Sequence, residues 1–335
     1  MTKKFVKRIV SGMIFLLIVS FLCACANNNV NIDTNSGNWK PTKTVTIICG
    51  YGVGGSSDLF ARILAKELSG YWNVNVVVNN IEGASGAVGT TQCFNAVPDG
   101  YTVFVSNGAT ITQSVQREFD WSYLDFTNIA KIIDEDEILC VSNSSGIDSL
   151  DKLIKLCKEK PGKVSIGVAG VGGYTYLAAE RFIKEYNLDV KVVPYNSGAE
   201  VVSAVMGGFV DFCIQQPAEL YSGIESEKLK AIVIMAEDRH ISTVLNNIPT
   251  SKEQNADFVM KQWRGISAPR NLPDEVKSEW MNALHEISLK ESFRDDVDSI
   301  LHARVDLICG SEFDGFLDEE NAWIEITMKD IGLVD

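Results

Sequence analysis

The feature that most constrains this fold is a repeated order of short β-branched runs, glycine-rich turns and amphipathic stretches. We expect strands at 45–49, 74–78 and 101–105, with helices at 57–69 and 84–96 between them. Apolar residues recur at helical spacing in the first of these helices. A β-α-β-α-β order connects parallel strands by right-handed crossovers. The first part of the chain therefore predicts an α/β unit with a parallel sheet.

A second set of the same kind begins near residue 140. Its expected helices and strands lie at 149–159, 164–168, 174–186, 190–193, 198–206, 210–214 and 229–235. The tail adds a helix at 273–289, with proline in its first turn, and another at 312–329. Two such units that face one another would form a cleft lined by helix N-termini. We therefore predict an α/β protein of two lobes.

Glycine-rich turns join several of these strands to the helices that follow. They lie at 50–58, 82–86, 169–175 and 196–199. Glycine takes positive φ easily and lets a ligand approach the backbone closely. The free N–H groups and the dipole at a helix N-terminus favour an anion, and Ser57 can cap its helix or donate to a ligand oxygen. Together the turns indicate an anion site between the lobes. The alternative is that each is only a tight turn with a cap.

The composition limits the partners of the protein. A length of 335 residues suggests about two domains. With 44 acidic and 30 basic residues, the formal net charge is −14. A body this acidic repels phosphate backbones, which argues against nucleic-acid binding. It does not exclude a local anion site, because salt screens charges more than about 8 Å away, whereas helix ends act within a few ångströms.

The N-terminal segment has the pattern of a secretory signal. A basic start precedes a largely apolar stretch at 9–22, which is short for a membrane-spanning helix. The sequence Leu-Cys-Ala-Cys at 22–25 resembles a bacterial lipobox, whose cysteine is lipidated and becomes the new N-terminus. We therefore expect a lipoprotein signal peptide at 1–24, a lipid on Cys25 that anchors the protein to the cell membrane, and a flexible tether at 25–40. Ordinary signal cleavage and an uncleaved anchor are the alternatives.

The remaining cysteines show no pattern of metal binding. They are Cys49, Cys93, Cys140, Cys157, Cys213 and Cys309. None forms a C-x-x-C pair, and no group of cysteines and histidines has zinc spacing, so we expect no metal site. Most of these cysteines end or interrupt apolar runs, which is typical of buried free thiols. Disulfide pairing of some of them is the alternative in an exported chain.

Two local patterns point toward enzymes but lack residues that the chemistry requires. Residues 50–55 match the dinucleotide pattern G-x-G-x-x-G, yet the next strand ends in Asn79 and Asn80, where an acid would hold the ribose. Residues 83–87 miss the nucleophile pattern G-x-S-x-G because the last of them is alanine. The histidines lie outside any motif, and we expect them to be packed or at the surface: His240, His285 and His302. We expect no catalytic residue and no cofactor, and an exported hydrolase remains an alternative.

Several motifs occur in order over roughly residues 40–335. They are 43–48, Gly54-Gly55-Ser56-Ser57-Asp58 with Ala61-Arg62, 76–80 with Gly83-Ala84-Ser85-Gly86, 98–101, 161–163, 177–180, Val193-Pro194-Tyr195, 206–211, 248–250, Trp263-Arg264-Gly265 and Ala268-Pro269. This set resembles the substrate-binding proteins of tripartite tricarboxylate transporters, the Bug family of extracytoplasmic solute receptors. The resemblance implies a type II periplasmic-binding-protein (Venus flytrap) fold. In such a fold, two α/β lobes close over a small carboxylate that is held largely by backbone N–H groups and water.

The resemblance also implies how the chain is organised and what it does. Residues 41–138 and 241–335 would form the first lobe, and residues 139–240 the second. The protein would be a monomer that captures a small carboxylate and delivers it to membrane permease subunits. A receptor of the same fold that senses the carboxylate is the main alternative.

The candidate ligand-binding residues lie in the turns and near the strand ends. They are Tyr51, Gly54, Gly55, Ser56, Ser57, Ser85, Gly86, Ser106, Gly172, Gly173, Tyr174, Thr175, Gly198, Ala199, Gln215 and Arg264. A valine side chain at Gly55 would block the approach of a ligand to the backbone. Asp58 matches an acid of the family motif, and we expect it to organise the loop, since an anion beside an anionic ligand is unfavourable.

Two places in the sequence bear on the ligand. Many members of the family carry Asp where this chain has Gln215 and Gln216, and a neutral amide tolerates an additional ligand carboxylate better. Arg264 could supply a permanent cation for that carboxylate, or could form a structural ion pair instead. We therefore hypothesise a di- or tricarboxylate rather than an amino acid.

Overall fold

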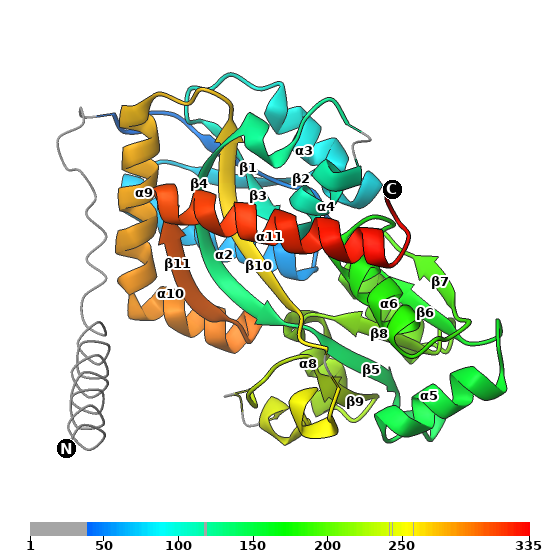
Figure 1. The fold of residues 1–335 in the computed structure, drawn as a ribbon. Helices are drawn as coiled ribbons and strands as arrows, with labels where there is room; N and C mark the ends of the chain where they lie inside the picture. The colour runs from blue at the N-terminus through cyan, green and yellow to red at the C-terminus, as the bar shows by residue number, and fades with distance from the viewer. Residues whose placement is uncertain (1–38, 117–118, 241, 243, 257) are drawn as a thin grey trace, which may run out of the picture. The chain divides into compact units, whose positions relative to one another are not determined.

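The computed structural model describes residues 39–335 apart from 117–118, 241, 243 and 257. The expected signal peptide, the lipidation site at Cys25 and all but the end of the tether lie outside the described residues. Within the described part, the chain forms two mixed β-sheets with helices packed against them (Figure 1). Each sheet with its helices is called a lobe below. The predicted two-lobe α/β fold is therefore confirmed.

The first lobe is built on a sheet of six described strands in the order β11-β4-β10-β3-β1-β2. The strands are β1 (Val45–Cys49), β2 (Val76–Asn80), β3 (Thr102–Asn107), β4 (Phe126–Asp136), β10 (Lys261–Pro269) and β11 (Arg304–Cys309). β2 and β3 pair parallel with β1, as the crossover pattern predicts. β10 runs antiparallel to both β3 and β4, and β11 runs antiparallel to β4, so the sheet is mixed.

The second lobe is built on a sheet of five described strands in the order β7-β6-β8-β5-β9. The strands are β5 (Ile138–Ser142), β6 (Ser165–Val168), β7 (Lys191–Pro194), β8 (Phe212–Gln215) and β9 (Leu229–Ile234). β6 pairs parallel with β7 and β8, whereas β5 runs antiparallel to β8 and β9. Glu137 is the single residue between β4 and β5, so the chain passes from one sheet to the other there.

The helices cover both faces of the sheets. They are α2 (Ser56–Trp72), α3 (Ala87–Phe94), α4 (Gly108–Gln116), α5 (Leu150–Glu159), α6 (Tyr174–Glu185), α7 (Gly198–Met206), α8 (Pro217–Glu225), α9 (Asp274–Leu289), α10 (Glu291–Asp296) and α11 (Gly310–Asp330). Figure 1 shows α11 crossing the front of the first lobe toward α6 of the second. Ile324 and Met328 of α11 belong to the same apolar cluster as Phe182 of α6, so the last helix joins the two lobes.

Alternate residues of the central strands are buried on opposite faces. Ile47 of β1 packs in the core under α2 and α9, whereas Ile48 packs under α3. Val103 and Phe104 of β3 repeat this division. Because both faces are covered, these strands are almost continuously apolar instead of alternating. This burial explains why their positions were readable from the sequence.

Most expected elements are confirmed in order and type, with shifted ends. β1 and α7 have the predicted bounds. The helix expected at 84–96 is shorter, because Ala84 and Ser85 take positive φ and α3 begins only at Ala87. The sequence pattern missed β4, β5, β10 and β11 and several short helices. β4 was hard to recognise because Lys131 and several acidic residues interrupt its apolar pattern.

The cysteines and histidines of the described residues serve as packing groups. The six described cysteines are buried and unpaired, as predicted. His240 and His302 are buried, and the His302 ring stacks on Tyr221 with centroids 3.7 Å apart. His285 is half-buried on α9. The expectation of packed or surface histidines is therefore confirmed.

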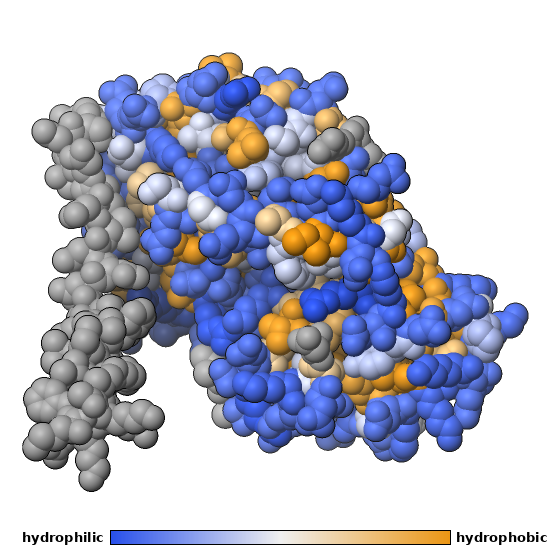
Figure 2. All heavy atoms as spheres, viewed as in Figure 1, coloured by the Kyte–Doolittle hydropathy of each residue, from blue (hydrophilic) through white to orange (hydrophobic). Residues whose placement is uncertain are grey.

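The described residues include no helix with the length and apolarity that crossing a membrane requires. Figure 2 shows that the face carrying α11 is mainly hydrophilic, with apolar side chains scattered over it.

We predict opposite effects for alanine at two glycines of the first lobe. Gly265 lies at a bulge of β10, where an added Cβ would overlap the Ala130 carbonyl oxygen. Gly265→Ala should therefore lower the free energy of unfolding by about 1–3 kcal/mol. Gly315 lies on the exposed side of α11, where an added Cβ has no neighbour within 4 Å. Gly315→Ala should raise the free energy of unfolding by about 0.5–1 kcal/mol, because alanine favours a helix. Urea unfolding measures both effects, and equal shifts would contradict the assigned packing.

Candidate functional site

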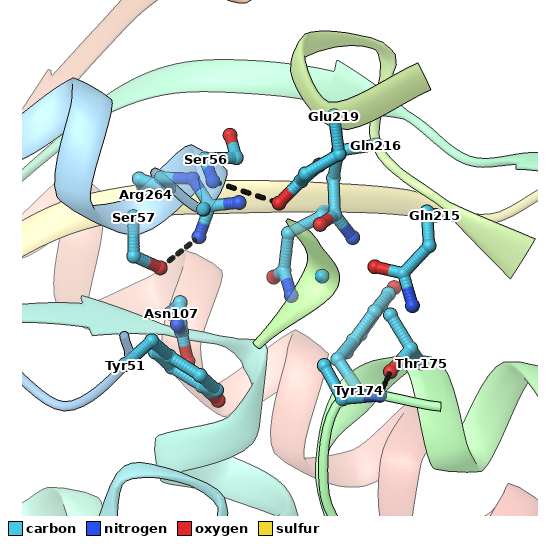
Figure 3. A pocket seen from close by; sticks show the side chains of 14 residues that line it. Tyr51, Ser56, Ser57, Asn107, Tyr174, Thr175, Gln215, Gln216, Glu219 and Arg264 are labelled. Carbon is cyan, nitrogen blue, oxygen red and sulfur yellow. Dashed lines mark hydrogen bonds between the residues drawn. The ribbon is translucent and has the colours of Figure 1, made fainter. Parts of the chain in front are cut away.

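A small cavity lies between the two lobes, at the N-termini of α2 and α7 (Figure 3). Its described lining comprises Tyr51, Gly55, Ser56, Ser57, Asn107, Ala169, Tyr174, Thr175, Gly198, Gln215, Gln216, Glu219, Gln262 and Arg264. The cavity volume is about 30 Å³, which is room for about two water molecules. A small carboxylate is larger than this. Such a ligand therefore fits here only when the lobes lie farther apart than in this structure.

The turn before α2 is held by the helix that follows it. Gly54 has a φ of 86°, which glycine adopts without strain. Its N–H donates to Asp58 Oδ2 at 3.0 Å, and Asp58 pairs with Arg62 at 2.8 Å. Asn80 at the end of β2 donates to Asp58 Oδ1 at 2.9 Å. Asp58 therefore organises the loop, as expected.

A buried ion pair fixes the first residues of α2. Arg264 of β10 and Glu135 of β4 are 2% and 1% exposed, and their Nε and Oε2 atoms are 2.6 Å apart. Arg264 Nη1 donates to Ser57 Oγ at 2.6 Å, and the Ser56 hydroxyl donates to Glu135. Burial raises the pKa of Glu135, although Arg264 acts against this shift. Arg264 thus forms the structural ion pair that was the alternative to a ligand contact, while its guanidinium still lines the cavity.

Gln215 at the end of β8 presents a buried amide on the opposite wall, across the cavity from Ser57 (Figure 3). The residue is 0% exposed, and neither Nε2 nor Oε1 has a hydrogen-bond partner in the described part of the protein. Each buried polar group without a partner costs about 1–3 kcal/mol. Because this amide faces the cavity, Gln215 is a candidate for contact with a ligand. The Nε2 group can donate to a carboxylate.

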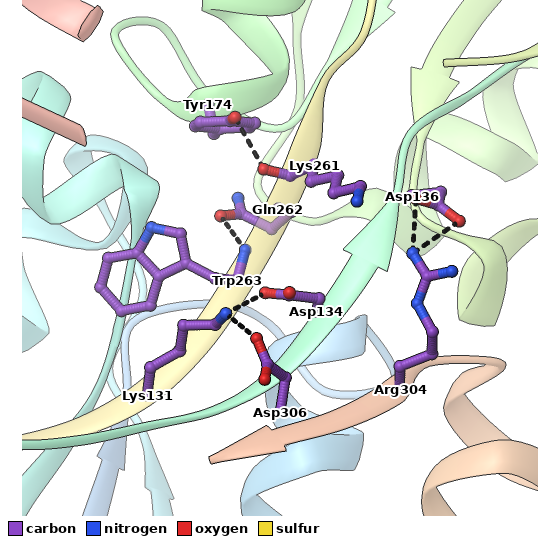
Figure 4. Close-up of polar contacts among 9 residues, drawn as sticks. All are labelled: Lys131, Asp134, Asp136, Tyr174, Lys261, Gln262, Trp263, Arg304 and Asp306. Carbon is purple, nitrogen blue, oxygen red and sulfur yellow. Dashed lines mark hydrogen bonds and ion pairs between the residues drawn. The ribbon is translucent and has the colours of Figure 1, made fainter. Parts of the chain in front are cut away.

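The first residues of α6 shape the same wall. Thr175 Oγ1 accepts a hydrogen bond from the Ala169 N–H at 3.0 Å, which closes the glycine turn at 169–175. The Tyr174 hydroxyl donates to the Lys261 carbonyl of the first lobe at 2.7 Å (Figure 4). The hydroxyl groups of Thr175 and Tyr174 therefore form hydrogen bonds within the protein, and these bonds fix the shape of the cavity.

Charged side chains join β4 to β11 close to the point where the chain passes between the lobes. Lys131 is buried and contacts Asp134 at 2.8 Å and Asp306 at 2.5 Å (Figure 4). Arg304 of β11 contacts Asp136 at 3.2 Å. These ion pairs hold the end of β4 in place. They therefore also fix the position of Glu137, through which the chain passes to the second lobe.

Two further carboxylates lie near the ion pair. Glu219, in the first turn of α8, lines the cavity, and its Oε1 accepts from the Ser56 N–H at 2.7 Å. Burial raises the pKa of Glu219 to about 7, although Arg264 opposes the shift. Glu137 is fully buried and accepts from Gln216 Nε2 at 2.7 Å, and burial raises its pKa to about 8. Three glutamates therefore surround one arginine.

Many of the residues expected from the sequence line the cavity. They are Tyr51, Gly55, Ser56, Ser57, Tyr174, Thr175, Gly198, Gln215 and Arg264. The lining also contains Asn107, Ala169, Gln216, Glu219 and Gln262, of which the sequence indicates only Ala169, within its glycine turn, and Gln216, beside Gln215. Gln216 directly follows β8 and Glu219 lies in the first turn of α8, so their position near a strand end was the available signal. The added Cβ of valine at Gly55 would meet no atom nearer than 3.6 Å, so the variant can fold, and the expected block of ligand approach stays a prediction.

The other expected residues do not line this cavity. They are Gly54, Ser85, Gly86, Ser106, Gly172, Gly173 and Ala199. Ser85 and Gly86 line a separate hollow of about 250 Å³, where the Ser85 hydroxyl donates to the Val171 carbonyl. The Ser106 hydroxyl is buried and bonded to Ser267 Oγ at 3.0 Å. The Gly172 carbonyl accepts from Thr112 Oγ1 at 2.6 Å. In this structure several of the glycine turns therefore form contacts between the lobes, and a ligand contact of these residues stays a prediction.

Metal and nucleophile chemistry find no support in the described part of the chain. No three His, Cys, Asp or Glu side chains group there in a way that could hold a metal ion. The described lining of the cavity includes neither histidine nor cysteine. Ser57 accepts a hydrogen bond from a guanidinium, which does not activate a serine as a nucleophile.

Comparison with known proteins agrees with this architecture. The family model described as the tripartite tricarboxylate transporter family receptor matches residues 60–305, more than half of the chain. Protein BugT of Bordetella pertussis is 28% identical over 72% of this chain and 75% of its own.

Two solved structures from Rhodopseudomonas palustris share the fold. Rpa4515 with adipate is 22% identical, covers 87% of this chain and 98% of its own, and has a TM-score of 0.82. MatC with bound malate is 23% identical, covers 86% and 99%, and has a TM-score of 0.80. The chain belongs to the receptor family of tripartite tricarboxylate transporters, a family of extracytoplasmic solute-binding proteins.

Proposed function

We propose that this protein binds a small di- or tricarboxylate outside the cytoplasm and delivers it to the membrane permease subunits of a tripartite tricarboxylate transporter. One observation carries the proposal. The N-termini of α2 and α7, one from each lobe, open onto the same cavity, together with the unpartnered amide of Gln215. Helix N-termini favour anions through their free N–H groups and their dipoles.

Closure of the lobes strengthens this site. The Ser85 hydroxyl donates to the Val171 carbonyl, and Thr112 donates to Gly172, so direct hydrogen bonds connect the lobes on one side of the cavity. We propose that residues 41–138 and 241–335 move as one lobe and residues 139–240 as the other. Excluding water from the cavity strengthens the hydrogen bonds to a bound carboxylate. The described lining contains neither histidine nor cysteine, so it fits a protein that captures a ligand between its lobes better than one that converts it chemically.

Two observations support a dicarboxylate as the ligand: the side chains of the cavity wall and the ligands of similar proteins. Gln215 and Gln216 place neutral amides where an acid would repel a second carboxylate. The similar proteins Rpa4515 and MatC are described with adipate and malate, which are both dicarboxylates. We propose the same chemical class for this protein, which acts as a monomer.

The first test is calorimetry with citrate, succinate and glutamate. We expect at least one of the two carboxylates without an amino group to bind more tightly than glutamate, since the neutral amides lack the negative charge that an acid there would offer an ammonium group. Preference for glutamate would overturn the proposed ligand class.

A second prediction concerns the amide of Gln215. Gln215→Leu removes two unpartnered buried polar atoms, so thermal stability should rise. The same change removes a donor to the ligand, so carboxylate affinity should fall about tenfold or more. Gln254→Leu is the matched control, because Gln254 lies outside the cavity lining. Gln254 Nε2 donates to the Ile232 carbonyl at 3.1 Å, so its loss should lower stability and leave carboxylate affinity unchanged. Unchanged carboxylate affinity in Gln215→Leu would show that Gln215 does not contact the ligand.

We also propose that Cys25 carries a lipid that anchors the protein to the cell membrane. A single acyl chain gives only reversible attachment, and a lipoprotein carries more than one. Cys25→Ser should therefore release the protein from the membrane fraction or leave it unprocessed. Cys49→Ser is a suitable control, because Cys49 is buried in the folded chain. Normal processing with full membrane retention of Cys25→Ser would contradict the anchor.

A further inference from the structure

The carboxylate of Glu219 lies where the proposed function places a ligand carboxylate. Its Oε1 accepts from the N–H of Ser56, the first residue of α2. The same oxygen would lie 2.6 Å from a Cβ added to Gly198, the first residue of α7. Glu219 therefore lies close to both helix N-termini, and Figure 3 shows the hydrogen bond that joins it to Ser56. A carboxylate ligand and Glu219 would therefore share the N–H donors at the starts of α2 and α7.

The second oxygen of Glu219 has no partner. Oε2 is shielded from solvent and accepts no hydrogen bond from the described residues. A carboxylate oxygen in this position is unfavourable when ionised, because burial removes its hydration. A protonated oxygen would instead be a donor. An acceptor brought by a ligand would then complete its hydrogen bonding.

The charges around Glu219 come from several elements. Glu135 of β4 and Glu137 between the sheets are acidic, and Arg264 of β10 is the cation of the cavity lining. Arg264 is already paired with Glu135 at 2.6 Å. The buried thiol of Cys213 on β8 has its pKa raised, first by burial and then by Glu219, so it stays neutral. The described lining of the cavity therefore offers no unpaired positive charge for Glu219 and a ligand together.

We propose that Glu219 takes up one proton when a carboxylate binds, and that its neutral carboxyl group then donates a hydrogen bond to the ligand. The inference rests on the proposed function and assigns a specificity-determining residue to that site. One O–H bond forms at Glu219, the proton comes from the solution, and no other covalent bond changes. A ligand carboxylate is accepted because the proton removes the charge that would repel it.

The direction of the pH dependence follows from the burial of Glu219. Burial between the closed lobes raises its pKa from 4.5 to about 7. An additional anion beside it raises the pKa further. Carboxylate binding is therefore strongest below about pH 7, where Glu219 already carries the proton. Binding weakens as the pH rises, because Glu219 must then take up a proton from solution. Above the pKa of free Glu219, the dissociation constant should increase about tenfold per pH unit.

The test is calorimetry of the full chain with succinate at pH 6 to 9. Each pH is measured in two buffers of different ionisation enthalpy, which gives the number of protons taken up. Succinate is fully ionised in solution above roughly pH 7, because free carboxyl groups titrate near pH 4–5. We expect uptake of about one proton per succinate at pH 8 and a tenfold loss of affinity per pH unit. Glu219→Gln should take up no proton and bind with nearly constant affinity over this range.

Glu225→Gln is the matched control, since Glu225 lies exposed at the other end of α8. It should keep the proton uptake and the pH dependence of the parent. Succinate binding without proton uptake in the parent would overturn the inference and leave the proposed function intact. Proton uptake that persists in Glu219→Gln would also overturn it, because another group would then carry the proton. If neither citrate nor succinate binds at any pH, both the proposed function and this inference fail.

Discussion

The buried pair of Arg264 and Glu135 is the interaction on which the site depends. Two charges are removed from water, and their attraction offsets that cost only when hydrogen bonds satisfy their remaining atoms. Ser56 and Ser57 supply such bonds, so the pair also fixes the start of α2. Removing one partner of a buried pair typically costs about 3–5 kcal/mol, because the other charge stays buried. The same contacts therefore stabilise the first lobe and orient the helix N-terminus.

The distribution of hydrogen-bond partners separates structural from binding groups. Asp58, Thr175 and Tyr174 are satisfied by the protein itself and hold turns or lobes in place. Gln215 and one oxygen of Glu219 lack partners in the described structure, although both are shielded from solvent. Folding alone gains nothing from such groups, since each is a desolvated donor or acceptor. Their retention is explained when a carboxylate held between the two lobes completes their bonding.

The sequence predicted the α/β units, the parallel strands β1 to β3 and the glycine turns before α2 and α7, because buried strands and helix starts have strong local patterns. It did not reveal β10, since long-range pairing with β3 and β4 decides that strand. It did not reveal the contact of Ser85 with Val171, because nothing local shows where that hydroxyl turns. Glu219 was missed for a similar reason. An acid in the first turn of a helix is ordinary, and only the tertiary structure brings this one to Ser56.

A crystal structure of the protein with a bound dicarboxylate tests the location of the site most directly. It should show carboxylate oxygens within hydrogen-bond distance of Ser57 and of Gln215 Nε2, with the ligand enclosed between the N-termini of α2 and α7. A ligand bound instead in the hollow of about 470 Å³ beside Trp323 and Arg304, with the inner cavity unchanged, would contradict this assignment.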